Sequence, residues 1–225
     1  MSTSRRRFLA ASAALLAGAP LSRALAQGRR APRQLSPQDQ ADLRRAEDYL
    51  NGITTMRARF TQVGQDGGNA EGMFSLARPG RLRLQYDLPT RDFVVADGAY
   101  IYHWDDKLQQ QQQTSIGSSL ADFILRPNIK LGGDVTVTGV QRRPGRLEIS
   151  LVQTDDPGQG ELTLVFEDGP QNQGPLALRQ WRVVDAQGLI TTVTLFGVET
   201  GVQFPRDQFA FVRPDQPRGG VWNSR

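Results

Sequence analysis

The residue types that perform catalysis or bind metal ions are few and scattered in this chain of 225 residues. It contains no cysteine, which excludes disulfides, thiolate metal sites and cysteine nucleophiles. His103 is the single histidine, and a lone histidine without a second ligand makes a poor metal site. We therefore predict no metal and no other cofactor, and we interpret His103 as a polar residue on one face of a strand.

Several short patterns resemble parts of catalytic sites but fit structural roles better. Asp105-Asp106 and Asp155-Asp156 are the kind of acid pair that supports acid–base chemistry when its two pKa values are split, yet both pairs fit solvated turns. Gly117-Ser118-Ser119 lacks the Gly-x-Ser-x-Gly pattern of a nucleophile elbow and fits a helix cap. Neither Gly67-Gly68 nor Gly132-Gly133 leads into the Lys-Ser/Thr of a phosphate loop. The sequence therefore predicts a protein that is not an enzyme.

The first 26 residues read as an export signal. A twin-arginine pattern at Ser4–Leu9 is followed by an apolar stretch too short to span a bilayer. Ala24-Leu25-Ala26 then offers a cleavage site, which predicts Gln27 as the mature N-terminus. We expect a periplasmic protein, and a soluble one because no cysteine is present for lipid anchoring.

Removal of this segment also changes the charge balance. The whole chain has a formal net charge of +4, but the segment carries four of its 27 basic residues and no acidic residue, which leaves 23 of each sign. A neutral mature chain does not favour binding to phosphate backbones. We therefore expect no nucleic-acid partner.

One amphipathic helix is predicted near the start of the mature chain. Ser36 is placed as its N-cap, Pro37 as its first residue and Asp39 at the capping-box position. Its apolar face recurs at helical spacing, and Gly52 is its expected end. That face is formed by Leu43, Ala46, Leu50 and Ile53.

From Met56 the apolar period changes from 3.6 to 2, which is typical of antiparallel strands with one apolar face. We predict about six strands, a short helix at Ser119–Leu125 with its own capping box, and about five more strands. The last two are expected at Leu176–Val184 and Leu189–Val198. The glutamine run Gln109–Gln113 is interpreted as a polar strand end that enters a loop.

These elements predict a mainly β (α+β) domain over residues 35–213, between a flexible lead-in at 27–34 and a flexible tail at 214–225. We expect one large, curved antiparallel sheet whose two helices cover one opening or face. A sheet of this size has an apolar concave side that one or two helices cannot fill, and an unfilled apolar concavity suits a lipid.

Five short motifs resemble the LolA family of periplasmic outer-membrane lipoprotein carriers in their order and spacing. The resemblance extends from about Leu35 to Pro214. The motifs are Ala58–Gln62, Gly72–Phe74, Arg78–Arg83, Val95–Gly98 and Phe209–Phe211.

The resemblance implies an unclosed β-barrel with a helical lid over an apolar cavity. It also implies that an inner-membrane lipoprotein-releasing ABC transporter hands over acylated lipoproteins, which the carrier, expected to be a monomer, brings to an outer-membrane acceptor. In the family the arginine of the Arg-Pro motif hydrogen-bonds to the lid backbone and holds the empty carrier closed, and Arg78 occupies that place.

Candidate residues for such a cavity follow from the alternation, although alternation alone does not tell which strand face is concave. The lid candidates are Leu43, Leu50, Leu120, Phe123 and Ile124. The lining candidates are Phe60, Phe74, Leu82, Leu84, Tyr86, Phe93, Val95, Tyr100, Tyr102 and Trp104.

Three other functions remain open at this point. A periplasmic lipid- or lipoprotein-sensing domain of an envelope stress pathway would use a related half-barrel. A periplasmic hydrolase is disfavoured because no nucleophile–base pair is recognisable. A small scaffold with a fully packed core would take up no lipid.

Overall fold

A computed structural model describes residues 34–65, 67–117, 120–169 and 174–214. The predicted signal segment and its cleavage site lie outside the described residues, as do residues 27–33 and 215–225 and the proposed cap residue Ser119. Residues 31–225 form one unit, to which all of the following applies. No helix in the described ranges is long and apolar enough to cross a membrane.

Helix α1 spans Pro37–Gly52 and begins as predicted. The Ser36 hydroxyl accepts a hydrogen bond from the main-chain N–H of Asp39, and the Asp39 carboxylate accepts one from the N–H of Ser36. This capping box satisfies main-chain donors that a helix start leaves without partners. The predicted apolar face is buried, with Ala46 and Leu50 at most 1% exposed.

The described strands follow the predicted order of six strands, a short helix and five strands. The short helix, η1, is a 3-10 helix at Leu120–Leu125, and a 3-10 turn, η2, spans Pro157–Gln159. The strands are β1 Thr55–Gly64, β2 Asn69–Ala77, β3 Arg81–Tyr86, β4 Phe93–Asp97, β5 Tyr100–Asp105, β6 Gln110–Ser115, β7 Val135–Arg143, β8 Arg146–Gln153, β9 Gly160–Glu167, β10 Ala177–Asp185 and β11 Ile190–Thr200.

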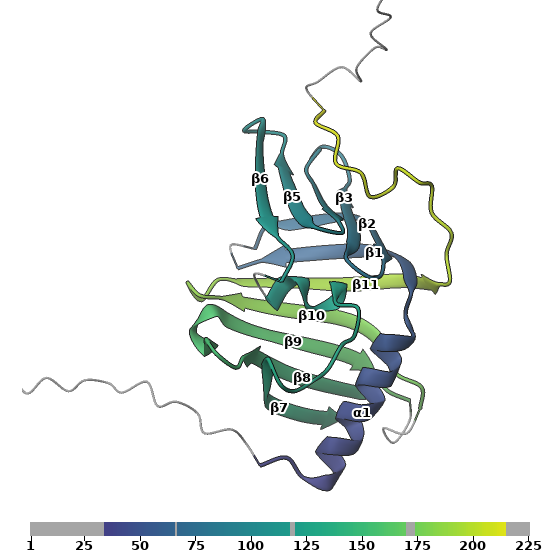
Figure 1. The fold of residues 1–225 in the computed structure, drawn as a ribbon, viewed down its shortest axis with the longest axis vertical. Coiled ribbons are helices and arrows are strands. Elements are labelled where there is room, and N and C mark those ends of the chain that lie inside the picture. The colour runs from purple at the N-terminus through teal and green to yellow at the C-terminus, as the bar shows by residue number, and fades with distance from the viewer. Residues whose placement is uncertain (1–33, 66, 118–119, 170–173, 215–225) are drawn as a thin grey trace, which may run out of the picture. The chain divides into compact units, whose positions relative to one another are not determined.

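All eleven strands form one sheet in the order β6-β5-β4-β3-β2-β1-β11-β10-β9-β8-β7. Each described ladder is antiparallel, and the non-consecutive pairing of β1 with β11 joins the two halves. The sheet ends at β6 on one side and at β7 on the other, so it is an unclosed barrel. Figure 1 shows its strong curvature, because β5 and β6 stand steeply to β7–β11. The predicted fold class is confirmed.

Close approach of neighbouring strands leaves no room for a side chain at Gly72. Gly72 on β2 lies opposite Tyr86 on β3 and Phe60 on β1. A Cβ atom at Gly72 would stand 2.1 Å from the carbonyl oxygen of Gln85 and 2.7 Å from a ring carbon of Phe60. The absence of a side chain therefore lets β2 and β3 pair beside the Phe60 ring.

The main core lies between the sheet and the two helices. Helix α1 and η1 lie on the same side of the sheet (Figure 1), and residues of both belong to one apolar cluster with residues of the strands. The helices thus supply the second layer that an amphipathic sheet needs.

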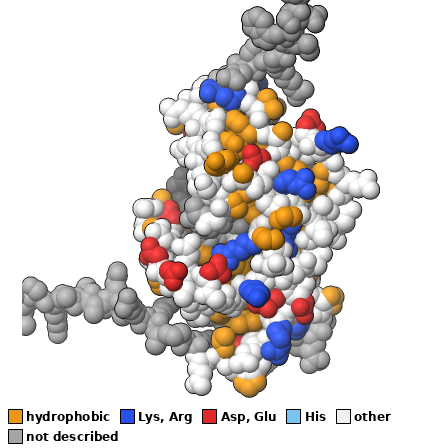
Figure 2. Space-filling view, in the orientation of Figure 1, with side chains coloured by type: hydrophobic (Ala, Val, Ile, Leu, Met, Phe, Trp, Pro, Cys, Tyr) orange, Lys and Arg blue, Asp and Glu red, His pale blue; other side chains and the backbone are white. Residues whose placement is uncertain are grey.

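On the face seen in Figure 2, Lys and Arg side chains lie beside Asp and Glu side chains instead of gathering in one area.

A second, smaller cluster lies apart from the main core. Phe93, Val95 and Trp104 are at most 4% exposed and pack with Phe211 from the segment after β11. The Phe211 ring stacks on Tyr102 with a centroid distance of 4.6 Å and an interplanar angle of 14°. The C-terminal segment thereby covers part of the sheet as a third layer.

The polar segments singled out in the sequence are turns and an edge strand. Asp105 is the last residue of β5 and its carboxylate accepts a hydrogen bond from the Leu108 N–H of the following turn, to which Asp106 belongs, and Asp156 is the N-cap of η2. The glutamine run was expected to enter a loop, but Gln110–Gln113 lies within β6. An edge strand with both faces largely exposed accepts such a polar sequence because it has no core to face.

Candidate functional site

The connection between β6 and β7 joins the two opposite edges of the sheet. This connection contains η1, which lies over the sheet and leaves an apolar cavity of about 310 Å³ beneath it. The lining comes from β1, β3, β4, β5, η1 and β9–β11. It consists of Gln62, Leu82, Leu84, Tyr86, Val94, Ala96, Ile101, Leu120, Phe123, Ile124, Leu125, Leu162, Leu164, Trp181, Val183, Thr191 and Val193.

The few polar groups of this lining are partly paired with each other. The Tyr86 hydroxyl donates a 2.8 Å hydrogen bond to the Gln62 side-chain oxygen. Burial raises the pKa of Tyr86, which keeps the hydroxyl neutral. The described residues hold no group of three or more His, Asp or Glu that could bind a metal ion. An apolar wall with a single neutral polar pair suits the packing of hydrocarbon.

Five of the predicted lining residues lie on this side of the sheet. Leu82, Leu84 and Tyr86 line the cavity directly. Phe60 and Phe74 belong to the surrounding core instead of the lining, and the Phe60 ring packs edge-on against Tyr86 at 5.3 Å. The apolar face of β3, which the alternation indicated, therefore faces the cavity.

The other five predicted lining residues do not reach the cavity. Phe93, Val95 and Trp104 form the second cluster, and Tyr100 and Tyr102 lie with Phe211 on that same face. The register explains this correction: Leu84 pairs with Val94 and Leu82 with Ala96, so the intervening residues of β4 face away from the cavity. The larger apolar side chains of β4 and β5 pack under the C-terminal segment instead.

Sequence reasoning missed the residues of β4 and β5 that do line the cavity. These are Val94, Ala96 and Ile101, which share the face of His103. The alternation of β4 and β5 included these residues, but both strands carry apolar side chains on both faces. The alternation therefore did not tell which face lines the cavity. The contribution of β9–β11 was also not named, although these strands were predicted.

The predicted lid residues divide between two positions. Leu120, Phe123 and Ile124 of η1 line the cavity. Leu43 and Leu50 of α1 lie in the main core, 7% and 1% exposed, and do not line it. The cavity wall opposite the sheet is therefore made by η1.

Arg78, in the turn between β2 and β3, connects the end of α1 with the segment after η1. Its guanidinium donates to the carbonyl oxygens of Leu50 and Ile53 on one side and of Arg126 and Pro127 on the other. The Arg126 oxygen accepts two of these bonds, at 3.0 Å from Nε and 2.7 Å from Nη2. One planar guanidinium thus bridges two segments through main-chain atoms.

The setting of Arg78 favours this bridge electrostatically. The last turn of α1 carries no basic residue, so Arg78 supplies from another element the positive charge that stabilises a helix C-terminus. Burial lowers the pKa of Arg78, but an arginine remains charged in proteins. Within the described residues its partners are neutral oxygens, so no ion pair competes with these bonds.

Residues 51–212 of the chain match the family described as outer membrane lipoprotein carrier protein LolA. The chain belongs to the LolA family. Outer-membrane lipoprotein carrier proteins of Azotobacter vinelandii and Methylococcus capsulatus are 27% and 25% identical to it, covering 79% and 76% of this chain and 86% and 83% of their own lengths. A LolA superfamily protein from Nitrosomonas europaea, of known structure, is 11% identical, with a TM-score of 0.42 over 76% of this chain and 97% of its own.

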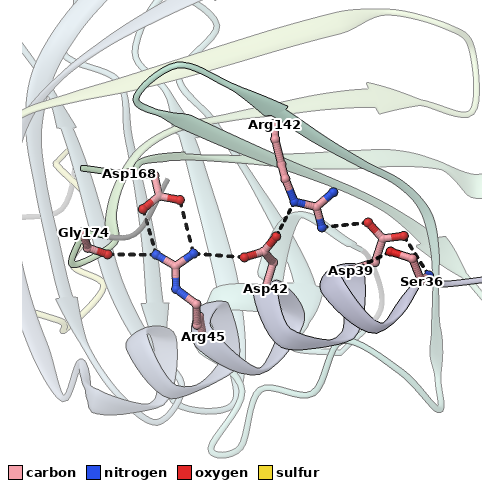
Figure 3. A network of polar contacts seen from close by, with 7 residues as sticks. All are labelled: Ser36, Asp39, Asp42, Arg45, Arg142, Asp168 and Gly174. Carbon is pink, nitrogen blue, oxygen red and sulfur yellow. Dashed lines mark hydrogen bonds and ion pairs between the residues drawn. The ribbon is translucent and has the colours of Figure 1, made fainter. Parts of the chain in front are cut away.

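The segment matched to the LolA family begins at Asn51, so nearly all of α1 precedes it. This part of α1 is attached to the sheet by a network of ion pairs (Figure 3). Arg142 of β7 contacts Asp39 at 2.8 Å and Asp42 at 2.5 Å, and Arg45 contacts Asp42 at 2.9 Å and Asp168 at 2.7 Å. The three carboxylates are buried.

Proposed function

We propose that this LolA-family chain is a periplasmic chaperone that encloses the acyl chains of lipoproteins and carries them from the inner to the outer membrane. Its partners would be acylated lipoproteins, a lipoprotein-releasing ABC transporter in the inner membrane and an acceptor at the outer membrane. The observation that carries the proposal is the apolar cavity under η1 in a chain of this family. The predicted export signal supports the periplasmic location.

The size of the cavity bears on how cargo is held. A dry apolar cavity of about 150 Å³ accepts benzene, so a volume of about 310 Å³ takes roughly a dozen carbon atoms. A myristoyl chain alone has about 14 carbons. An acyl chain of that length needs more room than the cavity offers, and outward movement of the wall formed by η1 would supply it.

Burial of acyl chains supplies the driving force for uptake. Each CH₂ group removed from water contributes about 0.8 kcal/mol, so several chains would bind too tightly to leave if nothing opposed them. The bonds of Arg78 to the segment after η1 oppose uptake, because they are made only while that segment is in place. We propose Arg78 as a latch whose recovered bonds favour release, with Leu120, Phe123 and Ile124 as the lid it holds.

The proposal is tested by mixing the mature protein with a synthetic triacylated lipopeptide and with the same peptide lacking its acyl chains. We expect native mass spectrometry to detect a one-to-one complex with the acylated peptide alone. A folded protein that binds neither peptide would refute carriage.

A matched pair of variants locates the binding site. Val183 lines the cavity from β10, whereas its neighbour Val184 does not, and both side chains are half-buried. We expect Val183→Asn to weaken lipopeptide binding because it puts an amide among hydrocarbon, and Val184→Asn to leave it unchanged. Equal effects of the two substitutions would place the acyl chains elsewhere.

A further inference from the structure

We propose that α1 is a fixed wall of the domain and that the cavity opens by movement of η1 and residues 126–131 alone. Arg45 and Arg142 are then positioning residues, since they hold α1 on the sheet while η1 moves. This inference rests on the proposed function and goes beyond it, because it assigns the movement to one of the two elements that cover the sheet.

The attachments of α1 to the sheet are charged and buried. Four contacts between guanidinium and carboxylate groups run without a gap from Asp39 through Arg142, Asp42 and Arg45 to Asp168 (Figure 3). Arg45 also donates a 2.8 Å bond to the carbonyl oxygen of Gly174. Asp39 and Asp168 are each 2% exposed, and lifting α1 would break the ion pairs of both carboxylates with Arg142 and Arg45 at once.

Two further contacts hold the second half of α1. The Tyr49 hydroxyl accepts a 2.9 Å hydrogen bond from the main-chain N–H of Leu178 in β10. The Tyr49 ring packs edge-on against Phe166 of β9 at 5.9 Å. These contacts reach different strands from the ion pairs, so α1 is fixed to β7, β9 and β10 along its length.

The segment that carries η1 is held differently. Its side chains toward the sheet are apolar and border the cavity, so they leave a space when they move instead of breaking polar contacts. Its polar attachments are main-chain groups: the Leu125 oxygen accepts from Gly80, and the oxygens of residues 126 and 127 accept from Arg78. These neutral oxygens can exchange their donors for water when the segment swings outward.

The boundary between the fixed and the moving part runs along one side of α1. Asn51 exchanges two hydrogen bonds with the main chain of Ile129, at 2.9 and 2.8 Å, and the Glu47 carboxylate accepts a 2.6 Å bond from the N–H of Leu131. Arg78 lies on the same boundary, with donors to both parts. Acyl chains therefore enter between η1 and the sheet, while α1 keeps its place.

Spin labels at pairs of introduced cysteines test this directly, because the chain has no cysteine of its own. Arg182 on β10 serves as the reference in both pairs, with Asp48 of α1 in one and Asn128 in the other, and all three side chains are exposed. We expect the triacylated lipopeptide to shift the Asn128–Arg182 distance distribution and to leave the Asp48–Arg182 distribution unchanged. A shift of the Asp48 pair as large as that of the Asn128 pair would overturn the inference.

Native mass spectrometry of the same labelled samples separates this result from the proposed function. A bound lipopeptide with an unmoved Asn128 pair refutes the inference alone, and absence of binding refutes both. A second arm adds Arg142→Met to the Asp48 pair. We expect the lipopeptide then to shift or broaden the Asp48–Arg182 distribution and Arg142→Lys to restore it, an outcome that a mere loss of stability would not produce.

Discussion

Arg78 donates two hydrogen bonds to the main-chain carbonyl oxygen of Arg126, 48 residues further along the chain. The guanidinium of Arg126 itself points elsewhere, to Asp134 at 2.8 Å and over the Phe123 ring at 4.7 Å. One arginine thus holds the backbone of the other. Because the bond depends on where residue 126 lies and not on its side chain, it reports the position of the lid segment itself.

Replacing Arg78 is expected to impair release more than uptake. Arg78→Leu removes the bonds that favour the closed arrangement, and a single hydrogen bond to a charged group contributes about 1.5 kcal/mol, or roughly a factor of ten. We expect lipopeptide binding to persist and its transfer to acceptor liposomes to slow by at least about tenfold. Arg81→Leu, an exposed position in the next strand, should transfer normally. Normal transfer by Arg78→Leu would refute the latch.

The ion-pair network is expected to matter far more than a surface pair. Arg142→Met leaves Asp39 buried without its partner, and loss of one partner of a buried pair costs about 3 kcal/mol. We expect a decrease of that size in the free energy of unfolding, measured with urea. Arg57→Met breaks the exposed pair with Glu199 at 2.7 Å and should cost less than about 1 kcal/mol. Similar losses from both variants would contradict the assigned role of the network.

Acid should weaken the same network. Burial by itself would raise the pKa of Asp39, but hydrogen bonds from the Ser36 main chain and from Arg142 outweigh it, so the pKa lies below the ordinary value of 3.8. A carboxyl group with a lowered pKa in the folded state contributes stability above 3.8, and this contribution is lost as the pH falls through its folded value. We expect stability to decline below about pH 4 and Asp39→Asn to flatten that decline. An unchanged slope in the variant would exclude Asp39 as its source.

Gly72 is expected to tolerate no side chain. The Cβ of Gly72→Ala would collide with the Gln85 carbonyl oxygen, so β2 and β3 must separate, at a cost of about 3 kcal/mol. Gly52→Ala is the matched control, because a Cβ at the end of α1 would meet nothing within 4 Å. Denaturant midpoints of the two variants should therefore move apart, and coinciding midpoints would disprove the clash.

Local patterns sufficed for most of the fold. Ser36, Pro37 and Asp39 located the start of α1 because capping acts within one turn, and strict alternation located the strands. The pairing of β1 with β11 did not follow from any local signal, since it joins residues such as Phe60 and Leu195 that are far apart in the chain. The glutamine run was expected to be a strand end that enters a loop, and the extent of the strand Gln110–Ser115 did not follow from the sequence because an exposed edge imposes no apolar pattern.

The site was predicted less completely. Leu82, Leu84 and Tyr86 were found because β3 has one clearly apolar face. β4 and β5 have two, since Phe211 from the chain end covers the outer one, and the larger side chains pointed to the wrong face. The place of Arg78 came from family resemblance, because no local rule tells which distant carbonyl groups a guanidinium will reach.

The open order of the sheet, with β6 at one edge and β7 at the other, has a mechanical consequence. In a closed barrel the circumference is set by strand ladders, and widening it means breaking them. Here the described ladders run from edge to edge without returning to their start, so the segment that joins the two edges and carries η1 can swing outward without breaking any of the ten strand pairings. The cavity can thus widen at η1 while every described strand keeps its neighbours.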